Sequence, residues 1–175
     1  MTGAFSQSLR LDTLGEAPRL LTLEAGEAER ARLAERFGLQ EIQFLSAEVS
    51  VTRNGGEVTA SGRLAARVVQ SCAASGAPVP AQVDEEFRIL FRPPADSAAE
   101  EETELGAEEL DVVFYEGASI DIGTAIADTL ALSLDPYPRA PDAEKVLRAA
   151  GVKSEEEVQP ASAFSGLKDL LKPKD

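Results

Sequence analysis

The sequence predicts a single α+β domain in which an antiparallel sheet has two or three helices at one side. Three observations predict it: a long hairpin pattern over residues 41–70, a short helix pattern before it, and an apolar helix pattern after residue 119. A chain of 175 residues is long enough for one such domain. It can bury roughly 70% of the surface that its unfolded form exposes, so it needs neither a disulfide nor a metal to fold.

The first forty residues contain two local patterns. Residues 5–24 alternate loosely between apolar and polar side chains, which predicts one or two short strands. Residues 26–38 are rich in Ala, Glu and Arg, which favour a helix, and Gly38 tolerates the backbone conformation that ends one. We therefore expect a short helix with Ala34 and Phe37 on one face.

Two strand patterns, residues 41–53 and 57–70, form the strongest structural signal. They are joined at Asn54-Gly55-Gly56, which supplies the positive-φ residues that a tight hairpin turn requires. In the second strand apolar and polar side chains alternate, as in a half-buried antiparallel strand. In the first strand the apolar phase changes between Phe44 and Leu45, which predicts a β-bulge or strong twist there.

A third long strand is predicted at about residues 79–92. Pro93 and Pro94 end it, because proline removes a hydrogen-bond donor and restricts the residue before it. Residues 95–109 are acidic and poor in large apolar side chains, which predicts a mobile loop. A short strand over residues 110–115 follows.

A helix is then predicted that is capped by Ser119 or Asp121 and runs to about Leu134, with an apolar stripe along one side. Residues 142–150 are expected to form one or two helical turns. We assign residues 1–150 to the α+β domain. Residues 151–175 are a polar tail that contains a short amphipathic segment at 163–171.

The charge of the chain is strongly acidic, with a formal net charge of −14. This charge favours basic partners and opposes non-specific contact with nucleic acid. The alternative interpretation is the ordinary acidic surface of a soluble protein. We expect a cytoplasmic protein with no membrane association. Cys72 is the single cysteine, the start of the chain lacks a signal-peptide pattern, and no apolar run reaches the length of a membrane span.

No catalytic, metal or cofactor site is predicted. The chain has no histidine, and Cys72 has no evident base beside it, so we expect Cys72 to be a packing residue. Asp84 and its two acidic neighbours cannot converge on Mg²⁺, because adjacent strand residues point to opposite faces. A metal site involving Asp84, Asp111 or Asp121 remains as the alternative hypothesis of a metal-dependent hydrolase.

Four arginines form the first candidate binding surface. Two have the same parity on one predicted strand and two on the next, so a suitable register would place all four on the exposed sheet face: Arg63, Arg67, Arg88 and Arg92. Such a patch could bind phosphate groups or an acidic protein surface. The alternative is cross-strand pairing with Asp84, Glu86 and Glu57, worth a few tenths of a kcal/mol each.

The second candidate surface is the turn Pro136-Tyr137-Pro138-Arg139, which carries an aromatic ring and a cation. We expect it at least to reverse the chain, with Tyr137 packed back on the sheet, and binding would be an additional role. Phe87 and Phe91 have the apolar parity of their strand. They are therefore expected in the core rather than on a base-stacking surface.

Several motifs in order resemble the bacterial YceD family. They are a hairpin arm over residues 62–72 that ends at Cys72, Pro78-Val79, a strand with Phe87 and Phe91, the acidic loop, Ile120-Asp121-Ile122-Gly123, the turn with Pro136 and Pro138, and Phe164 with Leu167. The resemblance covers most of the chain after about residue 40. It implies a role in 23S ribosomal RNA accumulation and large-subunit assembly, without a known catalytic activity.

One departure from the family concerns metal binding. Many relatives carry Cys-x-x-Cys where this chain has Cys72-Ala-Ala-Ser75, often with more Cys or His after the proline-rich turn, an arrangement that resembles a zinc site. Ser75 is a poor zinc ligand and the chain has no histidine, so we expect no zinc here.

The resemblance and the charge together lead to a functional hypothesis. We expect a non-enzymatic factor whose acidic surface binds a basic ribosomal protein or a large-subunit precursor particle. Any RNA contact would be limited to the arginine surface and to Lys168, Lys172 and Lys174. The alternatives are a metal-dependent RNA-processing hydrolase and an acidic protein-binding module unrelated to ribosomes.

Overall fold

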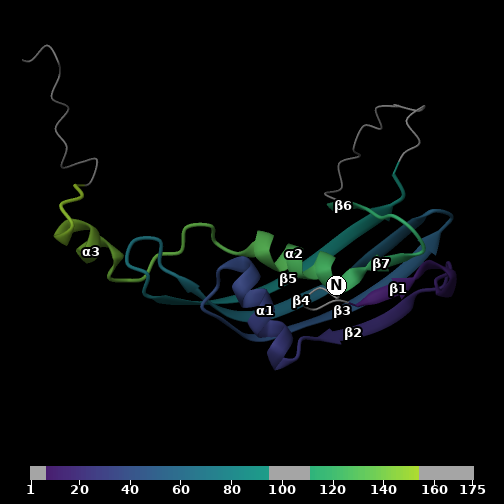
Figure 1. The fold of residues 1–175 in the computed structure, drawn as a ribbon, viewed down its shortest axis with the longest axis horizontal. Coiled ribbons are helices and arrows are strands. Elements are labelled where there is room, and N and C mark those ends of the chain that lie inside the picture. The colour runs from purple at the N-terminus through teal and green to yellow at the C-terminus, as the bar shows by residue number, and fades with distance from the viewer. Residues whose placement is uncertain (1–6, 95–110, 154–175) are drawn as a thin grey trace, which may run out of the picture.

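The computed structural model describes residues 7–94 and 111–153 (Figure 1). Their elements are β1 (Ser8–Arg10), a 3₁₀ turn η1 (Leu11–Thr13), β2 (Arg19–Glu24), α1 (Glu27–Phe37), β3 (Glu41–Asn54), β4 (Glu57–Ser71), β5 (Pro78–Arg92), β6 (Asp111–Phe114), β7 (Ser119–Asp121), α2 (Ile122–Ser133) and α3 (Ala143–Ala149). The acidic loop at 95–109 and the amphipathic segment at 163–171, with Phe164 and Leu167, lie outside the described residues.

The main sheet has five strands in the order β2-β3-β4-β5-β6. All neighbours are antiparallel except β5 and β6, which are parallel. The predicted α+β domain with a mostly antiparallel sheet is confirmed. The parallel β6 was not predicted, because a parallel neighbour arrives through a long connection rather than a local hairpin.

A second, two-stranded sheet joins β1 to β7, with Leu9 opposite Ile120. These partners are more than a hundred residues apart, so no local pattern in the sequence could reveal the pairing. The predicted cap of the following helix is nevertheless correct at Asp121. Its carboxylate accepts hydrogen bonds from the amide and the hydroxyl of Thr124, both at 3.0 Å.

The β3–β4 hairpin follows the sequence prediction closely. Gly55 has φ of 59° in the turn, and the register shifts between Ile42 and Phe44, as expected for a bulge. The shift lets Ile42 and Leu45 both face the core, where they are buried. The apolar side of β4 is buried as predicted, except at Gly62, which is only partly buried.

Helices α1 and α2 lie on one face of the main sheet (Figure 1). Leu33 of α1 and Ile126 and Leu130 of α2 are fully buried in the same core as the inner side chains of β3, β4 and β5. Between the two helices, Arg36 donates to Asp128 at 2.7 Å. One face of the sheet is therefore covered, and the other, which we call the outer face, remains exposed.

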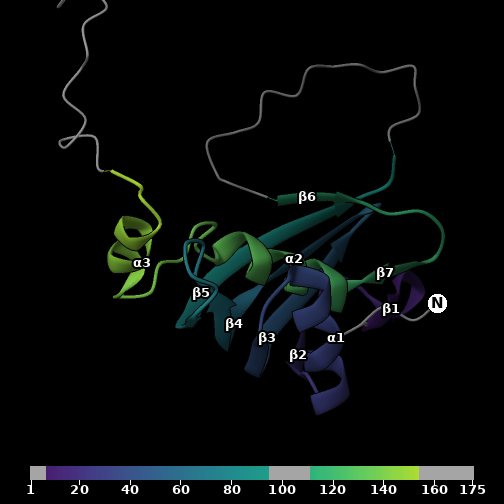
Figure 2. The same cartoon turned by 60° about the vertical axis from the view of Figure 1, so that its left-hand side comes forward.

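Helix α3 lies apart from these two, beyond the turn that follows β4 (Figure 2). A small second cluster of buried side chains, formed by Cys72, Ala140 and Ala143, connects the start of α3 to that turn. Among residues 7–94 and 111–153, no helix has the length and apolar character to cross a membrane.

Candidate binding surfaces

The strand register places the four predicted arginines on the outer face. Arg63 on β4 is opposite Glu86 on β5, Ser61 is opposite Arg88, and Arg67 is opposite Gln82. Arg92 has the same parity as Arg88 at the end of β5. Phe87 and Phe91, with the other parity, are buried on the covered side, as the sequence suggested.

Within the described residues, cross-strand carboxylates pair with Arg63 and with Arg92. Arg63 donates to both carboxylate oxygens of Asp84, at 2.5 and 2.8 Å, and Arg92 donates to Glu57 at 2.6 Å. Hydrogen bonds from Arg63 lower the pKa of Asp84 and, reciprocally, the pKa of Arg63 is raised. The guanidinium of Arg67 lies over the ring of Phe44, 5.5 Å from its centroid.

A shallow groove of about 770 Å³ crosses the outer face around Gly62. Its charged lining residues are two of each sign: Glu48, Glu86, Arg63 and Arg88. The outer face thus brings the arginines together, but it places carboxylates among them. Its local charge is nearly balanced rather than basic.

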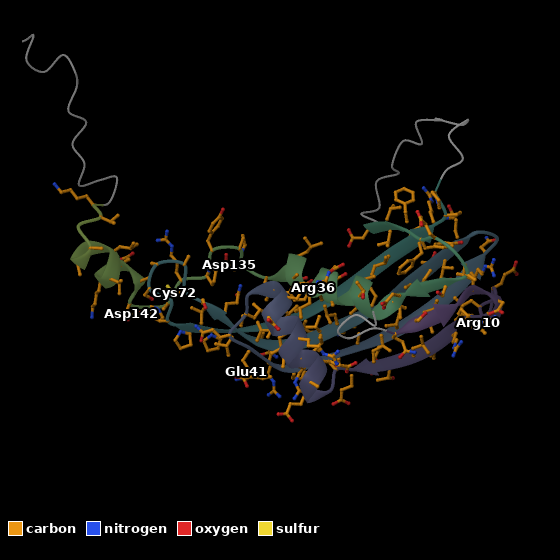
Figure 3. The ribbon with its side chains drawn as sticks, viewed as in Figure 1. Arg10, Arg36, Glu41, Cys72, Asp135 and Asp142 are labelled. Carbon is orange, nitrogen blue, oxygen red and sulfur yellow. The ribbon has the colours of Figure 1, made fainter. Side chains whose placement is uncertain are left out.

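Tyr137 and Arg139 are both exposed, at the end of the molecule that also holds Cys72, Asp135 and Asp142 (Figure 3). Tyr137 is 74% exposed, so the expectation that it packs back on the sheet is wrong. The turn is instead fixed by main-chain contacts. The amide of Tyr137 donates to Asp135 at 2.8 Å, and the amide of Ala73 donates to the carbonyl of Pro138 at 2.8 Å. The side chain of Tyr137 takes no part in these bonds and stays exposed to solvent.

Cys72 is buried, which is consistent with a packing role. Its sulfur nevertheless accepts hydrogen bonds from neighbouring groups. The amide of Ala140 donates to Sγ at 3.3 Å. This hydrogen bond, and then one from the hydroxyl of Ser75, lower the pKa of Cys72 to about 7. Donors that stabilise the thiolate outweigh the effect of burial, which acts in the opposite direction.

These residues do not fit a zinc site. Cys72 is one sulfur ligand, and Ser75 stands where a second would be needed. In the part of the chain that the structure describes, no three His, Cys, Asp or Glu side chains are grouped closely enough to hold a metal ion.

The three carboxylates proposed for a metal-dependent hydrolase, Asp84, Asp111 and Asp121, lie in two different places. Asp84 lies on the outer face in its pair with Arg63. Asp111 and Asp121 instead line a different groove, between β6 and α2. Asp121 already caps α2 there. Asp111 and Asp121 therefore share one groove, and Asp84 lies on another face.

This second groove, the β6–α2 groove, has a volume of about 460 Å³ and was not foreseen from the sequence. Its floor includes the buried side chains of Ile89, Phe91 and Ile120. At its rim, Phe114 is 66% exposed and Leu132 is 78% exposed.

The sequence does contain a signal for two of these residues. Leu132 is a large apolar residue off the apolar stripe predicted for its helix. Phe114 is a large aromatic residue in a short strand directly after an acidic stretch. Large apolar residues outside the predicted core faces are the ones to test for binding.

Comparison with known protein families gives a match over more than half of the chain. A family model described as "Large ribosomal RNA subunit accumulation protein YceD" matches residues 60–171. This span includes the outer-face arginines of β4 and β5, the turn at Cys72 and the β6–α2 groove. No curated protein and no solved structure matches the chain.

Proposed function

The chain belongs to the YceD family, and we propose that it is a cytoplasmic, non-enzymatic factor that supports the accumulation of 23S ribosomal RNA and the assembly of the large ribosomal subunit. The observation that carries this proposal is the family match, which spans more than half of the chain. The family's name concerns the RNA of the large ribosomal subunit.

We propose further that the factor works mainly by binding a basic ribosomal protein or a precursor particle. The net charge of −14 supports this mode, because it attracts basic proteins and repels RNA phosphates. A protein that binds RNA phosphates does so through basic side chains, and an acidic factor can hold such a protein before it reaches the RNA.

The outer face also supports protein binding over RNA binding. RNA binding gains free energy when basic side chains replace the counterions around phosphates. The pair of Arg63 and Asp84 is itself weak, since both side chains are about half exposed. The carboxylate nevertheless remains beside the arginine, well within the screening length of about 8 Å in physiological salt. We therefore propose that RNA contact on this face is limited.

Capture of the tagged protein from growing cells tests the proposal. We expect large-subunit proteins or precursor particles to be recovered at low salt and to be lost progressively as salt is raised. Treatment with ribonuclease before capture should leave the protein partner bound. Recovery of no ribosomal component, or loss of every component on ribonuclease treatment, would contradict protein-mediated assembly.

A further inference from the structure

Exposed apolar side chains gather at the β6–α2 groove. Phe114 and Leu132 stand at its rim with Val113, which is also partly exposed, above a floor of buried Ile89 and Phe91. Contiguous exposed apolar side chains with polar residues around them mark interaction sites on soluble proteins. Water covers them at a cost in free energy that a partner's apolar side chains would remove.

The charge of this groove differs from that of the outer face. The β6–α2 groove is lined by the four carboxylates of Asp111, Glu116, Asp121 and Asp128, and by no basic side chain of the described residues. Asp128 is paired with Arg36 and Asp121 caps α2. The side chains of Asp111 and Glu116 are exposed and have no hydrogen bond or ion pair within residues 7–94 and 111–153. The groove therefore offers negative charge to a partner.

The fold suggests which shape fits the groove. Helix α1 packs on β3, α2 packs on β4 and β5, and β6 is the edge strand beyond them (Figure 2). One wall of the groove is α2 and the other is β6. The groove therefore lies beside α2, where a further helix of the same layer would pack. A helix that lies beside α2 would cover Phe114 and Leu132 together.

We propose that the β6–α2 groove is the docking site for an amphipathic helix of a basic partner protein. The apolar side of that helix packs between Phe114 and Leu132, and its lysine or arginine side chains meet Asp111 and Glu116. This inference rests on the proposed function, because it names the surface through which the acidic factor holds its basic partner.

The first test uses the full chain and a labelled peptide of about 14 residues, roughly four helical turns. The peptide contains leucines on one helical face and lysines elsewhere, and a second peptide has glutamate in place of each lysine. Fluorescence anisotropy reports binding. We expect the lysine peptide to bind in a salt-dependent way and the glutamate peptide not to bind.

Matched variants locate the site. Leu132→Ser changes the groove rim, and Leu20→Ser changes an equally exposed leucine on β2, the opposite edge of the sheet (78% and 79% exposed). We expect Leu132→Ser to weaken binding about tenfold and Leu20→Ser to change it less than about twofold. Asp111→Asn with Glu116→Gln should weaken binding more than Glu16→Gln with Glu35→Gln, which removes the same charge elsewhere.

Several results would overturn the docking site. If the two variants of each matched pair weakened peptide binding equally, the peptide would be responding only to overall charge or to non-specific hydrophobic contact. Absence of lysine-peptide binding would show that the groove does not accept such a helix. Self-association of the chain that Leu132→Ser abolishes, seen by analytical ultracentrifugation, would assign the groove to a second copy. Circular dichroism of each variant verifies that it is folded.

Cellular capture with the same variants separates this inference from the proposed function. If tagged Leu132→Ser recovers the same ribosomal components as the unmodified chain, the docking site is wrong and the proposed function stands. If the unmodified chain binds the lysine peptide in its groove but recovers no ribosomal component, the proposed function fails. Loss of ribosomal components with Leu132→Ser, and not with Leu20→Ser, supports both.

Discussion

A β-carbon added to Gly62 on β4 would lie 1.9 Å from the main-chain oxygen of Glu48 on the neighbouring strand β3. Real β-carbons are essentially never closer than 3.0 Å to such an atom, and a main-chain oxygen cannot move aside as a flexible side chain can. The central strands therefore approach each other at this point more closely than any other residue type allows. The outer groove lies around this same position.

Gly62→Ala should accordingly destabilise the protein. Alanine in place of glycine usually favours a folded strand, because glycine gives the unfolded chain more freedom. Here the forced separation of β3 and β4 reverses that effect, and we expect a loss of about 2 kcal/mol or more in the free energy of unfolding. Urea denaturation measures it. Gly15→Ala, with no atom within 4 Å of the added carbon, is the matched control and should be nearly neutral.

Removal of the carboxylate beside Arg63 should strengthen RNA binding. In Asp84→Asn the guanidinium loses its charged partner and the outer face loses one negative charge. We expect tighter binding to a fragment of 23S ribosomal RNA and a steeper dependence on salt, by about one counterion. Filter binding over a range of salt concentrations measures both. No change in affinity with Asp84→Asn, together with no change with Arg63→Ala, would exclude this face as an RNA contact.

The thiol of Cys72 should titrate at lower pH in the folded protein than in the unfolded chain. Its folded pKa is lowered to about 7, against about 8.5 for an ordinary cysteine. The ultraviolet absorbance of the thiolate reports this directly, because Cys72 is the only cysteine in the chain. Ser75→Ala removes one donor and should raise the midpoint, and a folded midpoint near that of the denatured protein would contradict the hydrogen-bonded sulfur.

The same lowered pKa has a consequence for stability. Between the folded and the unfolded pKa, the unfolded chain binds more protons at this site than the folded chain does. Stability from Cys72 is therefore fully present above about pH 8.5 and is lost as the pH falls through about 7. Relative to Cys72→Ser, the unmodified chain should gain stability as the pH rises across this window. Urea denaturation of both chains at several pH values measures the difference.

The cap at Asp121 gives a prediction that separates structure from charge. Asp121→Ala removes the acceptor for the Thr124 amide and should cost about 1 kcal/mol in the free energy of unfolding. Asp121→Asn keeps an acceptor and should recover most of the loss. Chemical denaturation measures both variants. If asparagine were as destabilising as alanine, the negative charge rather than the cap would be the stabilising feature.

Local patterns in the sequence predicted the long elements well. Alternation identified β4, Asn54-Gly55-Gly56 identified the hairpin turn, and the phase change near Phe44 identified the bulge. Each of these depends on residues close together in the chain, where side-chain period and backbone freedom act directly. The parallel pairing of β6 and the pairing of β1 with β7 depend on distant residues, and these were not predicted.

The candidate surfaces divide in the same way. Parity along β4 and β5 correctly placed Arg63, Arg67, Arg88 and Arg92 on one face, since parity is a local property. Whether carboxylates would stand among them depended on the register between strands, and the sequence left that choice open. The exposure of Tyr137 was predicted wrongly. Its turn is fixed by the Tyr137 amide, which donates to Asp135, and by the Ala73 amide, which donates to Pro138, and not by the tyrosine side chain.

The sequence by itself determined the fold class, the long hairpin, the acidic charge and the family. Composition, periodicity and motif order depend only on which residues are present and on their spacing along the chain. Only the tertiary structure decided that carboxylates pair with Arg63 and Arg92, that Gly62 must be glycine, and that Phe114 and Leu132 line the same acidic groove. Those features arise from residues brought together by strand register and helix packing. Their free energies depend on distances in space, which spacing along the chain does not specify.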